Sequence, residues 1–165
     1  MSVAVGQHLP NISLKTMTPD GVRDVALADF CRGKRVVFFA VPGAFTPACS
    51  ARHLPGFLER SEALTRAGVD RIACIAVNDA FVMAAWARDN GVNDRIVMLA
   101  DGNGEFTRAA GLDHNARPFG MGLRSQRYAM VVEDGVVKML FVDPPGGFEV
   151  SSAEHVLQVL ERGAG

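Results

Sequence analysis

The apolar residues of this chain occur in short runs separated by turn signals, and the kind of run predicts the element. Unbroken apolar runs predict strands buried on both faces of a sheet, at residues 36–41, 72–77 and 96–100. Apolar residues at helical spacing predict helices that begin at Thr46, Phe57, Ala80 and Glu105. Strands and helices therefore alternate, which is typical of an α/β domain.

Turn signals divide the two ends of the chain further. Thr-Pro-Asp-Gly at residues 18–21 predicts a hairpin turn, and a short helix at 27–30 follows it. Asp134-Gly135 predicts a second hairpin between strands at 128–132 and 136–142.

Capping residues and prolines predict where the helices begin and end. Pro55 cannot donate a hydrogen bond to the carbonyl of Ala51, so we expect a helix kink or break near Leu54. Gly68 ends the helix at 57–67, and Asn78 or Asp79 caps the helix at 80–88. Ser-Ser-Ala-Glu at residues 151–154 matches a capping box and predicts a last helix to about Glu161.

Together the elements predict one domain over residues 1–165. Its fold class is α/β, with a mixed central sheet, helices on both faces and an N-terminal hairpin extension. The strand at 36–41 leads into the helix at Thr46 at the carboxyl edge of the sheet, where open α/β sheets bind ligands.

The composition excludes several classes of protein. With 165 residues, 48% of them hydrophobic, the chain can bury a hydrophobic core without disulfides or bound metals to stabilise it. Its net charge of −1 provides no basic surface for nucleic acid or anionic membranes, and no apolar run approaches the roughly twenty residues of a membrane helix. Three widely spaced cysteines predict neither a disulfide framework nor a zinc site. Without a secretory signal at residues 1–6, we expect a cytoplasmic protein.

The most distinctive stretch joins the strand at 36–41 to the next helix. It reads Pro-Gly-Ala-Phe-Thr-Pro-Ala-Cys over residues 42–49. Thr46 is a good N-cap and Pro47 suits the first helical position, so Cys49 is expected at about the third. The unpaired N–H groups and the dipole at a helix start favour a thiolate there. The stretch therefore predicts a nucleophilic cysteine.

This stretch resembles the active-site signature of the peroxiredoxins, Pro-x-x-x-Thr-x-x-Cys. The longer string through Ser50 is similar to their type II branch, also called the type-five subfamily. The likeness continues in order at residues 53–57, 77–82, 100–102 and 151–154. The resemblance implies a thioredoxin-like fold and reduction of hydroperoxides by Cys49.

Each residue of the expected site has a physical role in that reaction. Cys49 as a thiolate would attack the O–O bond and become a sulfenic acid. Arg127 matches the family's active-site arginine, and its permanent charge suits stabilisation of a thiolate; Arg124 is the alternative. Thr46 would orient the peroxide, and Pro42 would shield the sulfur from further oxidation.

Several other residues carry both a functional and a structural interpretation. Phe45, Phe119 and Met121 are candidates for the substrate entrance, although residues of these types are more often core. His53, one turn beyond Cys49, would be a proton donor, or else a solvent-side or capping residue. Cys74 lies within an apolar strand and is expected to be a core residue.

The resemblance also bears on how the sulfenic acid is recycled. Animal members of this branch carry a resolving cysteine near the last helix, whereas residues 146–152 here contain serines and no cysteine. Residues 120–127 and 150–154 are similar to plant and bacterial members, which use glutathione and glutaredoxin. We expect glutathione as co-substrate, no cofactor, and a homodimer. The alternative is thioredoxin as reductant with Cys74 as resolving cysteine; Cys31, in a predicted turn, is expected to be partly exposed.

Two other function classes are compatible with a reactive cysteine. A disulfide exchanger needs a second thiol three positions on, where this chain has Arg52. A redox sensor would use oxidation of Cys49 as a signal, and it differs from a peroxidase in reacting once rather than turning over.

Overall fold

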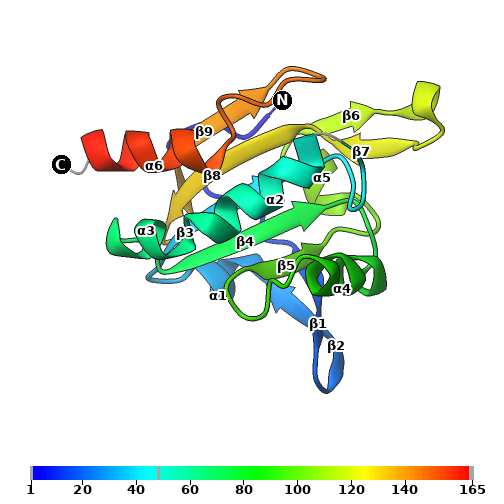
Figure 1. Cartoon of the computed structure of the whole chain (residues 1–165), viewed down its shortest axis with the longest axis horizontal. Coiled ribbons are helices and arrows are strands. Elements are labelled where there is room, and N and C mark those ends of the chain that lie inside the picture. Colours follow the sequence, from blue (N-terminus) through cyan, green and yellow to red (C-terminus); the bar gives the residue numbers. More distant parts are fainter. Residues whose placement is uncertain (1, 48, 164–165) are drawn as a thin grey trace.

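A computed structural model describes residues 2–47 and 49–163, without the side chains of Cys49 and Ser50. Within it, seven strands form one mixed sheet in the order β2-β1-β5-β4-β3-β8-β9, and β6 and β7 form a separate hairpin (Figure 1). The strand bounds are β1 Ser13–Thr18, β2 Gly21–Ala26, β3 Arg35–Ala40, β4 Arg71–Ala76, β5 Val97–Ala100, β6 Asp113–Asn115, β7 Leu123–Ser125, β8 Arg127–Glu133 and β9 Val136–Asp143.

The centre of the sheet explains the unbroken apolar runs. Strands β3, β4 and β5 are parallel neighbours, and β8 pairs antiparallel with β3. Val37 and Phe39 pack into one core layer, and Val36 and Phe38 pack into the layer on the opposite face. Because both faces are covered, neither alternate set of side chains is polar.

Helices cover both faces of the sheet, as predicted. Helices α2, α3, α4 and α6 contribute to the layer of Val37 and Phe39, while α1 and α5 contribute to the other layer (Figure 1). The helix bounds are α1 Leu27–Cys31, α2 Cys49–Glu59, α3 Ser61–Arg66, α4 Ala80–Asp89, α5 Glu105–Ala109 and α6 Ala153–Arg162, with a 3₁₀ turn η1 at Arg117–Phe119. None of the helices in the described part of the chain has the length and apolarity to cross a membrane.

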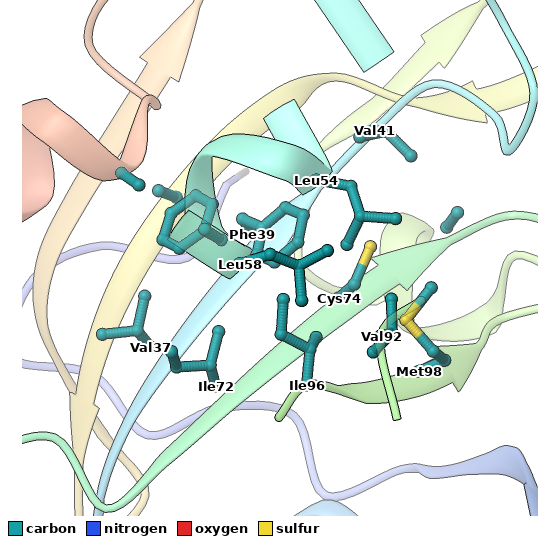
Figure 2. Packing of buried hydrophobic residues seen from close by; sticks show 14 of the residues in the cluster. Val37, Phe39, Val41, Leu54, Leu58, Ile72, Cys74, Val92, Ile96 and Met98 are labelled. Atoms are coloured by element: carbon teal, nitrogen blue, oxygen red, sulfur yellow. The ribbon is translucent and has the colours of Figure 1, made fainter. Parts of the chain in front are cut away.

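Of the kink or break predicted near Leu54, the break does not occur, because α2 runs through Pro55 and ends at Glu59. Leu54 and Phe57 on either side of the proline are fully buried in the core layer on the sheet, where Figure 2 shows Leu54. This packing holds the chain helical despite one missing hydrogen bond. The break falls instead at Arg60, so the predicted helix at 57–67 is divided between α2 and α3.

The predicted caps are confirmed at α4 and displaced by one residue at α6. The Asp79 carboxylate accepts a hydrogen bond from the Val82 N–H at 2.8 Å. At α6 the N-cap is Ser152, whose hydroxyl accepts from the His155 N–H at 3.1 Å, so the predicted box of Ser151 with Glu154 is not formed. The Ser151 hydroxyl donates to Asp143 instead, at 2.6 Å.

Candidate active site

The loop between β3 and α2 leads into the helix, whose described part begins at Cys49. Ala48 lies outside the described residues, so the cap at Thr46 and the third helical position of Cys49 stay predictions. The Thr46 hydroxyl donates to the Gly43 carbonyl at 2.7 Å, and the Ala44 N–H donates to the Asn78 side chain at 2.8 Å. The backbone of Cys49 thus lies in the first turn, where N–H groups without helical partners favour an anion. The Cys49 side chain lies outside the described residues.

Phe45 occupies a strained position in this loop. Its φ is +63°, in the left-handed region that a bulky side chain rarely adopts. Its side chain is 55% exposed. Strain of this kind costs of order 1–3 kcal/mol and persists only where the surrounding bonds fix the backbone.

A cavity of about 540 Å³ opens beside the start of α2. Of the residues predicted for the site, Pro42, Thr46, Arg127, Phe119 and Met121 line it, while Phe45 is not among the described residues of its wall. The remaining lining residues are Pro47, His114, Ala116, Ser125, Gln126, Asp143, Pro144, Pro145 and Gly146.

Two of the lining residues, His114 and Asp143, are not among those predicted from the sequence. His114 belongs to the β6–β7 hairpin, whose strands are too short to give a periodic signal. The hairpin pattern could have predicted that Asp143 lies near the site. Strands β8 and β9 pair Arg127 with Asp143, which brings both residues to one end of the sheet.

The two candidate arginines have different surroundings. Arg127 is the first residue of β8 and is 8% exposed, and one guanidinium nitrogen donates to Nδ1 of His53 at 3.0 Å. Arg124 donates to the carbonyls of Met121, at 3.0 Å, and Val77, at 3.1 Å. Arg124 therefore ties the β6–β7 hairpin to the end of β4, while Arg127 lines the cavity.

His53 is neither a solvent-side nor a capping residue, because its side chain is fully buried. Its Nε2 lies 2.8 Å from the Ser151 carbonyl, and its Nδ1 faces Arg127. Burial, with the Arg127 charge beside it, lowers the pKa of His53 to about 3. At neutral pH the ring is uncharged and its one N–H is already bonded, so a role as proton donor to substrate does not fit.

Asp143 organises the loop between β9 and α6. Its carboxylate accepts hydrogen bonds from the Ser151 hydroxyl and from the backbone N–H groups of Glu149, Val150 and Ser151, at 2.6–3.2 Å. Burial by itself would raise the pKa of Asp143, but these bonds outweigh it and the pKa is lowered. Asp143 is therefore a charged anchor within the wall of the cavity.

Cys31 and Cys74 are both buried in the core. Cys74 lies on β4 beside Leu54 of α2, and desolvation raises the pKa of its thiol (Figure 2). Cys31 was expected to be partly exposed, but it is the last residue of α1 and is fully buried, and burial raises its pKa to about 11. The turn begins only after Cys31, and Phe30 and Cys31 face the core together.

Comparisons with known proteins match almost the whole chain. A protein-family model described as Redoxin matches residues 4–157. Peroxiredoxin-2E, chloroplastic, of Arabidopsis thaliana is 48% identical over 163 residues, which are 96% of this chain and 70% of that protein. Peroxiredoxin-2E-2, chloroplastic, of Oryza sativa is 49% identical over 164 residues, 96% of this chain and 73% of that protein.

A solved structure has the same architecture. The reduced Prx3 of Vibrio vulnificus in complex with hydrogen peroxide superimposes with a TM-score of 0.92 and 49% identity, covering 96% of this chain and 99% of that one. The likeness therefore extends over nearly the whole chain.

Proposed function

This chain belongs to the type II branch of the peroxiredoxins and has their thioredoxin-like fold, and we propose that glutathione and glutaredoxin recycle its reactive cysteine, Cys49. Peroxiredoxins are thiol peroxidases with an antioxidant role, so the reaction is reduction of a hydroperoxide by a cysteine.

The chemistry at Cys49 follows from its thiolate. The sulfur attacks one peroxide oxygen, the O–O bond breaks, and the other oxygen leaves as hydroxide or alkoxide and takes up a proton. The sulfur is oxidised by two electrons to a sulfenic acid, and the peroxide is reduced to water or an alcohol. A thiol with an ordinary pKa would be only a few per cent ionised at neutral pH, so the site must stabilise the anion.

The observation that carries this assignment is the shared cavity of Pro42, Thr46 and Arg127 at the start of α2. Arg127 would stabilise the thiolate and the departing oxygen, since its charge is permanent and it offers several donors. Thr46 would orient the peroxide, and Pro42 would limit access of a second peroxide to the sulfenic acid. Phe119 and Met121 would contact the organic group of an alkyl hydroperoxide; a substrate role for Phe45 stays a prediction.

Recycling by glutathione is supported by the burial of the other two thiols. Cys31 and Cys74 are both 0% exposed, and the loop after β9 carries Ser151 and Ser152. A glutathione thiolate attacking the sulfur of the sulfenic acid would form a mixed disulfide and release hydroxide, which takes up a proton to give water. Glutaredoxin would then take the glutathione and restore the Cys49 thiol.

The test is the mass of the protein after one equivalent of peroxide in the presence of glutathione. We expect one glutathione on Cys49, with Cys31→Ser and Cys74→Ser giving the same adduct and Cys49→Ser giving none. A disulfide between Cys49 and Cys74, lost in Cys74→Ser together with turnover by thioredoxin, would contradict the proposal and favour thioredoxin as the reductant.

The oligomeric state and location complete the proposal. We expect a homodimer in the cytoplasm, which light scattering and cell fractionation would test. Two of the relatives are chloroplastic by name, so the location needs its own measurement. Repeated turnover of peroxide with reductant in excess separates an enzyme from a redox sensor, which would react once.

A further inference from the structure

A chain of hydrogen bonds runs from the loop after β9 to the guanidinium of Arg127. The Asp143 carboxylate accepts from the hydroxyl and the N–H of Ser151, at 2.6 and 3.0 Å. The Ser151 carbonyl faces Nε2 of His53 at 2.8 Å, and Nδ1 of His53 faces Arg127 at 3.0 Å. The chain thus joins three segments that are far apart in the sequence.

The chemistry of the partners fixes the state of the imidazole between them. A guanidinium has only donors, so Nδ1 of His53 must accept from Arg127. A carbonyl has only acceptors, so Nε2 must carry the proton and donate to Ser151. The ring is therefore one neutral tautomer, and protonation of Nδ1 would break its bond to Arg127.

Aromatic packing holds the ring in this orientation. The His53 ring contacts Phe39, with centroids 4.9 Å apart, and Phe148, with centroids 5.0 Å apart. The guanidinium of Arg127 lies over Phe148 as well, 5.9 Å from the ring centre. These ring contacts, together with a hydrogen bond at each ring nitrogen, favour one orientation of the imidazole.

We propose that His53 is a positioning residue, whose Nδ1 aims the Arg127 guanidinium into the cavity and whose own position is set by Ser151 and Asp143. A neutral acceptor orients the guanidinium without adding a negative charge beside it. The loop from Asp143 to Ser152 is then part of the active site, although it contributes no group to the reaction. This inference rests on the proposed role of Arg127 toward the Cys49 thiolate.

The test compares His53→Leu with His53→Asn. Both lose the bond to Ser151, but the Asn side-chain oxygen can take the place of Nδ1 and accept from Arg127. In single-turnover oxidation of Cys49 by peroxide, we expect His53→Leu to be slowed about tenfold to a hundredfold and His53→Asn to recover most of that rate. Titration of the Cys49 thiolate should show a higher pKa in His53→Leu than in His53→Asn.

A third variant, Arg127→Gln, separates failure of this inference from failure of the proposed function. If Arg127→Gln is slow while His53→Leu and His53→Asn both react like the wild type, or are slowed equally, the positioning role is overturned. If Arg127→Gln itself reacts like the wild type, the proposed role of Arg127 is overturned. Urea midpoints of the two His53 variants, expected to be similar, control for folding.

A direct reading of the tautomer needs no activity. In protein labelled with ¹⁵N-histidine, we expect the His53 proton on Nε2 and a bare Nδ1 across about pH 5 to 8. A proton on Nδ1 in that range, as the other tautomer or as imidazolium, would overturn the inference.

Discussion

An arginine lies at each end of strand β8, and the two arginines bind different kinds of partner. At its first residue, Arg127 is 8% exposed and donates to a neutral imidazole, His53. At its last residue, Glu133 accepts two hydrogen bonds from Arg35 of β3, at 2.6 and 2.9 Å, where the arginine side chain is 34% exposed.

The difference distinguishes an arginine that joins two strands from the arginine that we propose acts on the Cys49 thiolate. A carboxylate neutralises the charge that it binds, so the pair of Arg35 and Glu133 fastens β3 to β8 and offers little to a ligand. The uncharged imidazole of His53 accepts a hydrogen bond from Arg127 without itself neutralising the guanidinium, and Arg127 lines the cavity of about 540 Å³. The group that an arginine contacts therefore helps to distinguish a structural arginine from one that lines a binding site.

The largest expected effect is on the rate of peroxide reduction. Arg127→Gln should lower the second-order rate constant of Cys49 oxidation by about a hundredfold, because a charged donor to the transition state is lost. Arg35→Gln is the matched control at the other end of the sheet and should react like the wild type. Stopped-flow oxidation of both variants measures this, and equal rates would remove the distinction between the two ends.

The next effect is the loss of stability in acid that His53 causes. Its pKa of about 3 in the folded protein lies below the ordinary value of 6.5, so the unfolded chain binds the proton more tightly. This contribution to stability is complete above pH 6.5 and is lost as the pH falls toward 3. Between pH 7 and pH 5 the free energy of unfolding should drop by about 2 kcal/mol more in the wild type than in His53→Leu.

Urea unfolding at the two pH values measures that difference. Asp143 is present in both proteins, so its own titration contributes to both losses. Equal losses in the wild type and His53→Leu would mean that the imidazole is charged or exposed in solution.

A smaller effect is expected from the partly exposed ion pair. Glu133→Gln should lower the free energy of unfolding by about 1 kcal/mol or less, since solvent screens such a pair. The variant should keep the wild-type peroxide rate, and high salt should reduce its deficit. Urea unfolding at two salt concentrations is the measurement; a slowed peroxide reaction would show that both ends of β8 act on the site.

The smallest effect concerns the cavity wall. Phe119 is 76% exposed but lines the cavity, so Phe119→Ala should raise KM for a bulky organic hydroperoxide by about threefold and leave hydrogen peroxide nearly unaffected. Phe81→Ala, an exposed aromatic on α4 outside that wall, is the control. An equal change for both substrates would argue against a contact with the organic group.

The sequence predicted those parts of the molecule that local patterns determine. The central strands, the Asp79 cap and the turn at Asp134-Gly135 depend on neighbouring residues, and all three are present. By residue type, Ser151 and Ser152 are equally good N-caps for α6. Asp143, eight positions earlier, accepts a hydrogen bond from the Ser151 hydroxyl, which leaves Ser152 as the cap. A helix continuing through Pro55 likewise depends on the sheet beneath it.

In the candidate site, too, local patterns predicted some residues, and others depend on contacts between distant segments. The motif drew attention to Pro42 and Thr46, and the family likeness to Arg127; these three share one cavity, although their roles remain predictions. Burial of His53 could not be read from its position one turn after Cys49, because it results from Phe39, Phe148 and the loop after β9 closing around the ring.

Because Cys31, Cys74 and Tyr128 are buried, the ionisation of Cys49 can be followed by ultraviolet absorbance without overlap from these three groups. Tyr128 is the one tyrosine of the chain, and its enclosed hydroxyl has no hydrogen-bond partner among the described residues. Burial raises the pKa of all three groups, to about 11 for Cys31, so none of these chromophores ionises near neutrality in the folded protein. Ultraviolet absorbance gained on raising the pH through the neutral range therefore belongs to a single sulfur, and wild-type protein can be titrated without deleting any other residue.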